Sequence, residues 1–286
     1  MHVCLNGRLI PYDRATVSVN DRGFVYGDGI FETLRAYGGR PFHLREHWRR
    51  LLHHARKLRL AVPFTYGGLE KTVGRLLRMN RLSDATIKIV LSRGVGRGTA
   101  FQGAWKPTWV VWVRPLELPP PELYRKGIAV RIPAWRQNAR GLVSHLKTLN
   151  YLERVFTREM LRARGTYEAI FLITDGDVAE GTYSNVFGVR GGRVFTPDLH
   201  ASVLPGVTRQ IVLRLCRREG IPVAERRVTP DDLRRADELF ITNSLIEVLP
   251  VTSLDGRKIG IGRPGPSTRL LADAYRREAA GSSGRG

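Results

Sequence analysis

The sequence predicts a mixed α/β fold, and three observations support this prediction. Short apolar or alternating segments, typical of strands, are interspersed with longer segments in which apolar residues recur at the helical period. The chain has 286 residues, of which 42% are hydrophobic and 26% charged, so it can bury a sizeable core in one large or two ordinary domains. A proline-rich stretch near residue 120 divides the chain.

The part before the prolines contains strands and two helices. Asn6-Gly7 is a hairpin signal between two short apolar segments. From Leu44 to Leu58, apolar residues recur every three or four positions, which predicts an amphipathic helix. We expect strands at 3–6, 8–10, 30–37, 86–92 and 108–113, and helices at 44–60 and 69–79.

The proline-rich stretch predicts a domain boundary. Four prolines stand between Pro115 and Pro121, and such a run favours a stiff extended connector. We therefore expect a small α/β domain at 1–114, a connector at 115–127, a large domain at 128–280 and a disordered tail at 281–286.

The part after the prolines has more and shorter strands. Turn signals at Asp175-Gly176 and Gly191-Gly192 separate them, and Pro205-Gly206 opens a helix. We expect strands at 128–132, 169–173, 178–179, 186–189, 194–196, 238–242 and 247–251, and helices at 149–163, 208–219 and 268–278.

The charge balance is strongly basic, with 47 Lys and Arg against 26 Asp and Glu and a formal net charge of +21. Such a charge raises nucleic-acid binding as a function, because Lys and Arg neutralise phosphates. However, the arginines are scattered from Arg8 to Arg285 and mix with apolar residues on the expected helices. This distribution favours solvated helix faces, and nucleic-acid binding stays a minor alternative.

Cysteine content and hydropathy argue against a disulfide-rich, secreted or membrane protein. Cys4 and Cys216 are too few for a disulfide scaffold or a cysteine zinc cluster. No apolar run approaches the length of a membrane span, and the N-terminus lacks the pattern of a secretion signal. We expect a cytoplasmic protein without a membrane partner. The seven histidines form no plausible ligand set, so we expect no metal site.

Lys147 is the residue best suited to covalent chemistry. It stands between Leu146 and Thr148-Leu149, just before an expected helix, in a chain that uses Arg for most of its positive charge. Unlike Arg, a Lys can lose its proton near neutral pH and form an imine. A surface lysine is the alternative at this point. Pro205–Thr208, at a helix start, has the free N–H groups that bind phosphate.

Taken together, several segments resemble the class IV, or fold type IV, pyridoxal phosphate enzymes. The resemblance runs in order from 21–35 through the segments around Lys147, Glu180 and Thr208 to 262–271. The family includes branched-chain aminotransferases, D-amino acid aminotransferases and aminodeoxychorismate lyases. It implies a small N-terminal α/β domain, a larger C-terminal pseudo-barrel domain, pyridoxal 5'-phosphate as cofactor and a homodimer.

The resemblance also implies the roles of the central residues. Lys147 matches the Schiff-base lysine, which also moves the proton at the substrate α-carbon. Glu180 matches the carboxylate that pairs with the pyridine nitrogen and keeps it protonated, so that the ring withdraws electrons. Tyr151 matches a tyrosine beside the cofactor's phenolic oxygen.

The same resemblance implies the phosphate contacts. Arg50 matches the phosphate-binding arginine, with its neighbour Arg49 as the alternative. The further expected contacts are Val207, Thr208 and Ser244, with Thr242 or Asn243 nearby.

The substrate is harder to predict than the cofactor. Arg93 and Arg97 follow an expected strand, and an arginine fork suits a substrate carboxylate. Phe31 stands where the D-amino acid enzymes commonly have Tyr, and Thr99 stands where they have His. We expect Phe31, Arg93 and Arg97 to contact the substrate. Amino transfer between an amino acid and a 2-oxo acid is the main hypothesis, and formation of 4-aminobenzoate and pyruvate from aminodeoxychorismate is the alternative.

Overall fold

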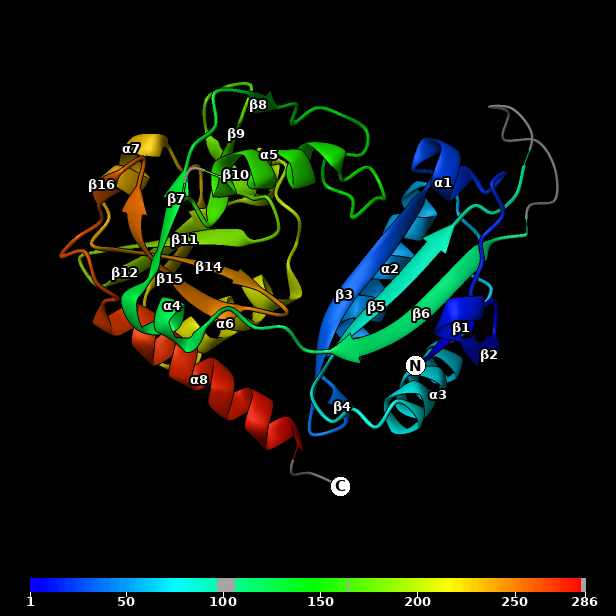
Figure 1. Cartoon of the computed structure of the whole chain (residues 1–286). Helices are drawn as coiled ribbons and strands as arrows, with labels where there is room; N and C mark the ends of the chain where they lie inside the picture. The colour runs from blue at the N-terminus through cyan, green and yellow to red at the C-terminus, as the bar shows by residue number, and fades with distance from the viewer. Residues whose placement is uncertain (97–105, 164, 284–286) are drawn as a thin grey trace. The chain divides into compact units, whose positions relative to one another are not determined.

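The structure is a computed structural model that describes residues 1–96, 106–163 and 165–283 (Figure 1). The chain divides into two compact units. The first unit comprises Met1–Glu117, Leu146–Asn150 and the chain from Ala279, and the second comprises Leu118–His145 and Tyr151–Glu278. The segment Leu146–Asn150, which the sequence placed in the large domain, therefore clusters with the first unit.

The first unit is built on a six-stranded sheet in which every strand pair is antiparallel. The strand order is β2-β1-β6-β5-β3-β4. The turn between the first two strands has positive φ at Asn6 and Gly7, as the hairpin signal predicts. The strands are β1 (His2–Leu5), β2 (Arg8–Pro11), β3 (Gly29–Tyr37), β4 (Arg40–Pro41), β5 (Ala85–Ser92) and β6 (Thr108–Pro115).

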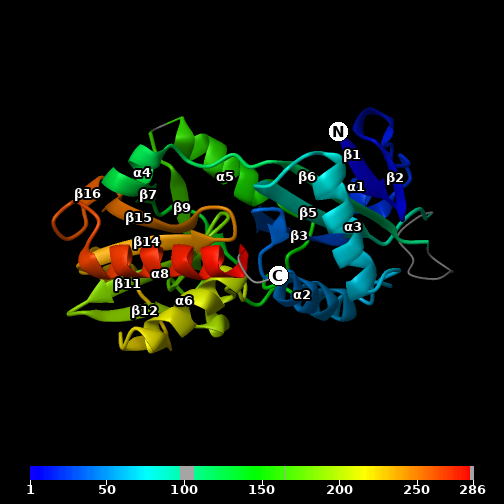
Figure 2. The ribbon, with the colours of Figure 1, turned by 90° about the horizontal axis from the view of Figure 1, so that it is seen from below.

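Two helices cover one face of this sheet (Figures 1 and 2). Helix α2 (Leu44–Lys57) packs on β3, and α3 (Tyr66–Met79) packs on β6. The strands alternate, so every second residue, such as Leu34, enters the core beneath the helices. The residues between them, such as Lys88, are half-buried on the face that these helices leave uncovered. A short helix, α1 (Arg22–Tyr26), precedes β3.

The second unit is built on a larger mixed sheet of ten strands. Its main path is β10-β9-β7-β15-β14-β11-β12-β13, and β8 and β16 pair with β9 and β15. Parallel pairs join β7 to β9 and β15, β8 to β9, and β12 to β13. The strands are β7 (Ile128–Arg131), β8 (Arg136–Gln137), β9 (Glu168–Ile173), β10 (Val178–Gly181), β11 (Asn185–Arg190), β12 (Arg193–Pro197), β13 (Val223–Arg226), β14 (Glu238–Asn243), β15 (Glu247–Leu254) and β16 (Arg257–Lys258).

Five α-helices accompany this sheet. Helix α6 packs against β14, and α5 packs against β9. In both ribbon views, α6 and α8 run beside the strands (Figures 1 and 2). The helices are α4 (Pro121–Lys126), α5 (Leu152–Arg162), α6 (Val207–Arg218), α7 (Pro230–Arg234) and α8 (Pro266–Ser283).

Two expectations from the sequence are wrong in detail. The proline-rich connector is not extended throughout, because Pro121 begins α4, where a missing N–H costs nothing at the first helical position. The helix expected from residue 149 begins at Leu152, because the N–H of Leu149 donates to the carbonyl of Gly29. Helix α8 is described as far as Ser283, and the disordered tail at 281–286 stays a prediction.

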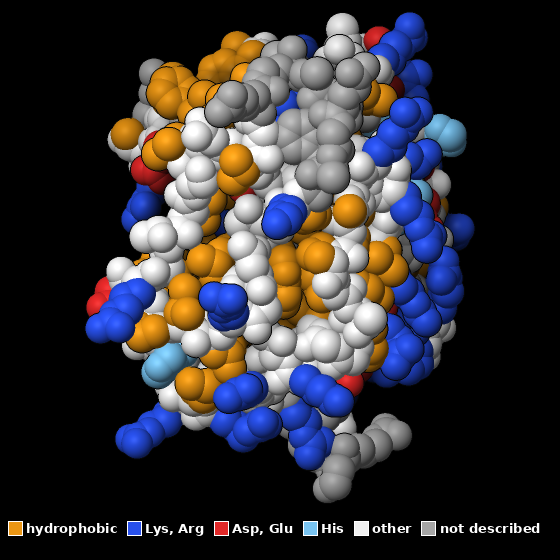
Figure 3. Space-filling view, turned by 90° about the vertical axis from the view of Figure 1, so that its right-hand side faces the viewer, with side chains coloured by type: hydrophobic (Ala, Val, Ile, Leu, Met, Phe, Trp, Pro, Cys, Tyr) orange, Lys and Arg blue, Asp and Glu red, His pale blue; other side chains and the backbone are white. Residues whose placement is uncertain are grey.

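The excess positive charge is visible on the protein surface. Figure 3 shows Lys and Arg side chains gathered along one margin and the lower edge of the face drawn, around a central area rich in hydrophobic side chains. Within the described residues, no helix is long and apolar enough to cross a membrane.

The packing under α2 and α3 can be tested with Leu34→Ala. Leu34 is fully buried on β3, so its truncation leaves a cavity and should lower the free energy of unfolding by about 2–5 kcal/mol. The measurement is urea denaturation. Met79→Ala, at the end of α3 where the side chain is 40% exposed, is the control. A loss for Leu34→Ala no larger than that of the control would contradict this packing.

Candidate active site

Lys147 is held against the start of β3. Its backbone N–H donates to Nδ1 of His54 at 3.2 Å, and its carbonyl accepts the N–H of Phe31 at 2.9 Å. The N–H of Leu149 donates to the carbonyl of Gly29 at 3.0 Å. The side-chain Nζ of Lys147 lies 4.3 Å from the centroid of the Phe31 ring. The backbone of this lysine is therefore fixed on both sides, and its ammonium lies beside an aromatic ring.

A buried carboxylate, Glu32, organises the surrounding part of the first unit. Glu32 lies in the core-facing row of β3 and is fully buried. Arg50 donates to both of its oxygens, with Nε at 2.8 Å and Nη2 at 2.6 Å. Nδ1 of His47 lies 2.7 Å from the same carboxylate. The paired Arg fork and the imidazole together compensate a charge that would otherwise be very costly to bury.

The ionisation of these groups follows from their burial and their partners. Burial by itself raises the pKa of Glu32, but the charge and hydrogen bonds of Arg50, with the hydrogen bond from His47, hold that pKa well below its usual range. Burial and the nearby Arg50 charge lower the pKa of His54 to about 4. His54 is therefore neutral at pH 7, as its acceptor role toward the Lys147 N–H requires.

In the second unit, a second buried carboxylate is held in a comparable way. Glu180 on β10 accepts from Nη2 of Arg154 at 2.7 Å, from the N–H of Leu204 at 2.9 Å and from Nδ2 of Asn185 at 3.2 Å. Burial alone would lower the pKa of Arg154, but the charge of Glu180 raises it. These three hydrogen bonds fix the orientation of the Glu180 carboxylate.

The start of α6 has the features of an anion site. Gly206 caps this helix without a side-chain hydrogen bond, and Val207 and Thr208 form its first turn, where helix geometry leaves N–H groups unpaired. The hydroxyls of Thr208 and of Thr242, at the end of β14, are buried and have no hydrogen-bond partner within the described residues. Because α6 packs on β14 and buried hydroxyls are normally satisfied, these groups fit a phosphate.

Two further residues of the second unit that were expected to contact the cofactor are Asn243 and Tyr151. Asn243 accepts from the N–H groups of Leu245 and Ile246, so its side chain forms the turn that carries Ser244. Tyr151 stands at the start of α5, with its ring centroid 5.5 Å from that of Tyr183.

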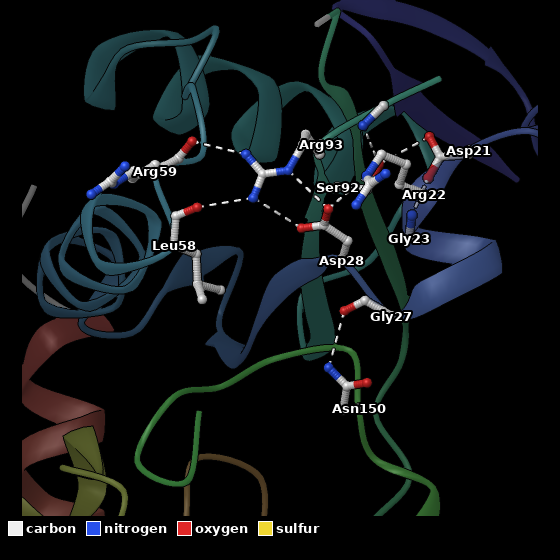
Figure 4. A network of polar contacts seen from close by, with 11 residues as sticks. Asp21, Arg22, Gly23, Gly27, Asp28, Leu58, Arg59, Ser92, Arg93 and Asn150 are labelled. Atoms are coloured by element: carbon white, nitrogen blue, oxygen red, sulfur yellow. Dashed lines mark hydrogen bonds and ion pairs between the residues drawn. The ribbon is translucent and has the colours of Figure 1, made fainter. Parts of the chain in front are cut away.

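Arg93, directly after β5, is buried in a polar network (Figure 4). Its Nε and Nη2 donate to the carboxylate of Asp28 at 2.8 and 3.1 Å, and its guanidinium also donates to the carbonyls of Leu58 and Arg59. These bonds occupy the fork that the sequence assigned to a substrate carboxylate. Arg97, the other candidate, lies outside the described residues.

Several residues of these clusters were not identified from the sequence. Glu32, His47 and His54 carry the network next to Lys147, and Arg154 and Asn185 orient Glu180. Glu32 could have been recognised from the sequence, because it occupies a position of the strand where the alternating pattern places apolar residues in the core. A charged residue at such a position requires a buried partner. Arg49 is exposed while its neighbour Arg50 is held by Glu32, which favours Arg50 among the two arginines considered.

The described part of the chain contains no candidate metal-binding site. There, no group of three or more His, Cys, Asp or Glu side chains is arranged to hold a metal ion.

Comparison with known families identifies the chain. Residues 29–254 match the family model described as amino-transferase class IV. The chain belongs to the class IV aminotransferases. The matched range includes β3, Lys147, Glu180 and the start of α6, so it covers both clusters described above.

Relatives of this class IV aminotransferase carry two kinds of name. A putative branched-chain-amino-acid aminotransferase of Methanocaldococcus jannaschii is 39% identical over 96% of both chains. A D-alanine aminotransferase of Bacillus licheniformis is 35% identical over 96% of this chain and 95% of the relative.

Among solved structures, the branched-chain amino acid aminotransferase from Thermobaculum terrenum in its PLP form is 30% identical. It matches with a TM-score of 0.89 over 98% of this chain and 94% of that chain. These findings confirm the family, the mixed α/β fold of type IV and the assignment as an aminotransferase.

The low pKa of His54 predicts how acid affects stability. Because the folded-state pKa is about 4 and the usual value is 6.5, the unfolded chain binds more protons between these values. The free energy of unfolding should therefore fall as the pH drops from 6.5 to 4. His54→Asn, which retains an acceptor for the Lys147 N–H but cannot be protonated, should reduce this slope.

The measurement is urea denaturation at several pH values, with His53→Asn as the control, because His53 is the exposed neighbour on α2. Equal slopes for the wild-type protein and His54→Asn would show that His54 is not buried in its neutral form.

Proposed function

We propose that this class IV aminotransferase binds pyridoxal 5'-phosphate and transfers an amino group between an amino acid and a 2-oxo acid. The observation that carries the proposal is the placement of Lys147, whose backbone is fixed by His54 and Phe31 and whose Nζ lies beside the Phe31 ring. The aminotransferase names of the relatives support amino transfer rather than lyase chemistry.

The residues present fit the cofactor. The buried, unpartnered hydroxyls of Thr208 and Thr242 suit its phosphate, together with the N–H groups of Val207 and Thr208 at the start of α6. Arg50 adds a positive charge, and its bonds to Glu32 set the orientation of its guanidinium. Ser244, on the turn formed by Asn243, is a further candidate for a phosphate contact.

When bound, the cofactor supplies an electron-withdrawing ring that stabilises negative charge on the substrate α-carbon. Glu180 is the proposed partner of the ring nitrogen, because Arg154 and the N–H of Leu204 hold its carboxylate in one orientation. A carboxylate beside that nitrogen favours a proton on it. Tyr151 is the proposed neighbour of the phenolic oxygen.

Lys147 is the proposed attachment point of the cofactor and the general base of the reaction. Its neutral amine removes the α-proton of the substrate and returns a proton later, so both functions need one well-placed nitrogen. The hydrogen bonds of its N–H and carbonyl restrict where the side chain begins, and they reduce the conformational freedom that must be lost for proton transfer.

A homodimer and a cytoplasmic location are the proposed context of the enzyme. Large hydrophobic side chains are exposed on the single chain, among them Phe24 (76%), Leu142 (86%) and Leu152 (79%), which supports burial by a second copy. Cys4 and Cys216 are buried free thiols, which suits a reducing compartment.

The substrate can be established with a panel of acceptors and donors. We expect amino transfer from at least one amino acid when branched-chain and D-amino acids are paired with pyruvate or 2-oxoglutarate. Aminodeoxychorismate in the same panel tests the lyase alternative. Release of 4-aminobenzoate without transfer from any amino acid would replace the proposed reaction with the lyase reaction.

The role of Lys147 predicts the loss of a spectral signal. The purified protein with pyridoxal phosphate should show the visible absorbance of a lysine-bound cofactor, and Lys147→Ala should abolish it and reduce the rate at least 1,000-fold, on the order of the loss of a catalytic nucleophile. Lys71→Ala, on the exposed side of α3, is the control. Retention of the band in Lys147→Ala would assign the attachment to another lysine.

The unpartnered hydroxyl of Thr208 predicts opposite effects in the two forms of the protein. Thr208→Val keeps the shape and removes an unsatisfied buried hydroxyl, so the cofactor-free protein should be as stable as wild type or more stable. Affinity for pyridoxal phosphate should fall about tenfold. Thermal denaturation and equilibrium binding provide the two measurements.

Thr196→Val is the matched control for this test. The Thr196 hydroxyl already donates to the carbonyl of Val186 at 2.7 Å, so its removal should lower stability without changing cofactor affinity. Unchanged affinity in Thr208→Val would remove Thr208 from the phosphate site.

A further inference from the structure

Lys88 lies in a part of the first unit to which no role has been assigned so far. It stands in the middle of β5, on the face of the sheet that α2 and α3 leave uncovered. Thr33 on β3 and Trp112 on β6 are its cross-strand neighbours. Its ammonium is half-buried, lying 4.8 Å from the centroid of the Phe31 ring and 5.9 Å from that of Trp112.

The same aromatic ring also contacts Lys147. Nζ of Lys147 lies 4.3 Å from the centroid of the Phe31 ring, so the two ammonium groups share one neighbour. Lys88 therefore lies within the immediate surroundings of the lysine proposed to perform the chemistry.

The charge of Lys88 is not compensated by any carboxylate within the described residues. Burial lowers the pKa of Lys88, and the positive charges of Lys147 and Arg114 lower it further. Arg114 also has aromatic partners, with its guanidinium carbon 4.3 Å from the centroid of the Trp112 ring. A half-buried ammonium among cations costs free energy, which an anionic ligand would offset.

We propose that Lys88 binds a carboxylate of the amino-acid or 2-oxo-acid substrate, as a specificity-determining residue on the uncovered face of the β3-β5-β6 sheet. This inference rests on the proposed function. The guanidinium of Arg93 is occupied by Asp28, whereas among the described residues the partners of the Lys88 ammonium are aromatic. The ligand is a carboxylate because every substrate of amino transfer carries one, and a dicarboxylic acid carries two.

The test compares Lys88→Met, which removes the charge but keeps most of the length, with Lys88→Arg, which retains the charge. Binding of pyruvate and of 2-oxoglutarate is measured by calorimetry, and KM and kcat are measured for both acids. In Lys88→Met, Kd and KM should rise about tenfold or more, while kcat changes less than about threefold. Lys88→Arg should recover most of the affinity.

The pattern of loss identifies which carboxylate is bound. Weaker binding of both acids assigns Lys88 to the carboxylate next to the reacting carbon. Weaker binding of 2-oxoglutarate alone assigns it to the distal carboxylate. Lys71→Met removes the same charge from the exposed side of α3 and should leave both constants unchanged.

Two results would overturn the inference. One is unchanged affinity for both acids in Lys88→Met. If Lys88→Met does not fold, Lys88→Gln takes its place in this comparison. The other is equal impairment of Lys88→Met and Lys88→Arg, which would indicate packing against Phe31 and Trp112 rather than charge. Because the calorimetric measurement needs no turnover, failure of amino transfer in the wild-type protein would remove the proposed reaction and still leave this binding result decisive.

Discussion

The first unit depends on one buried carboxylate. Glu32 interrupts the apolar row of β3, and its charge is tolerated only because Arg50 and His47 face it from α2. This pairing fixes the register of α2 on the sheet. His54 lies two turns after His47 on the same helix face, so the same register places its Nδ1 at the N–H of Lys147. The position of Lys147 thus follows from the charge compensation of Glu32.

In the second unit, an arginine likewise compensates a buried carboxylate. Glu180 is buried, and Arg154 compensates it with a guanidinium that also binds backbone carbonyls. In each unit, an Arg rather than a Lys faces the buried acid, because the planar fork can satisfy several acceptors at once. Part of the arginine content therefore has a structural role, which the net charge of +21 alone did not reveal.

Features that depend on local chemistry were predictable from the sequence. The Asn6-Gly7 turn, the helical period of α2 and the chemical distinction of Lys147 in an Arg-rich chain all follow from neighbouring residues. Pairings across the fold were not predictable. Nothing local shows that Arg93 faces Asp28, 65 residues earlier, or that Pro121 begins a helix instead of extending the chain. The segment around Leu149 was assigned to a helix, because its pairing with β3 is a long-range interaction.

The pairing of that segment has a consequence for biosynthesis. Leu146–Asn150 belongs to the first unit although the flanking residues on both sides belong to the second. When the ribosome has completed Glu117, the start of β3 still lacks this partner. The N–H that donates to His54 lies 93 residues further along the chain and has not yet been synthesised. A gene fragment ending at Glu117 would therefore encode six strands and two long helices without Lys147. Lys147 is synthesised only after Leu118–His145 of the second unit, so the first unit is completed while the second is already emerging.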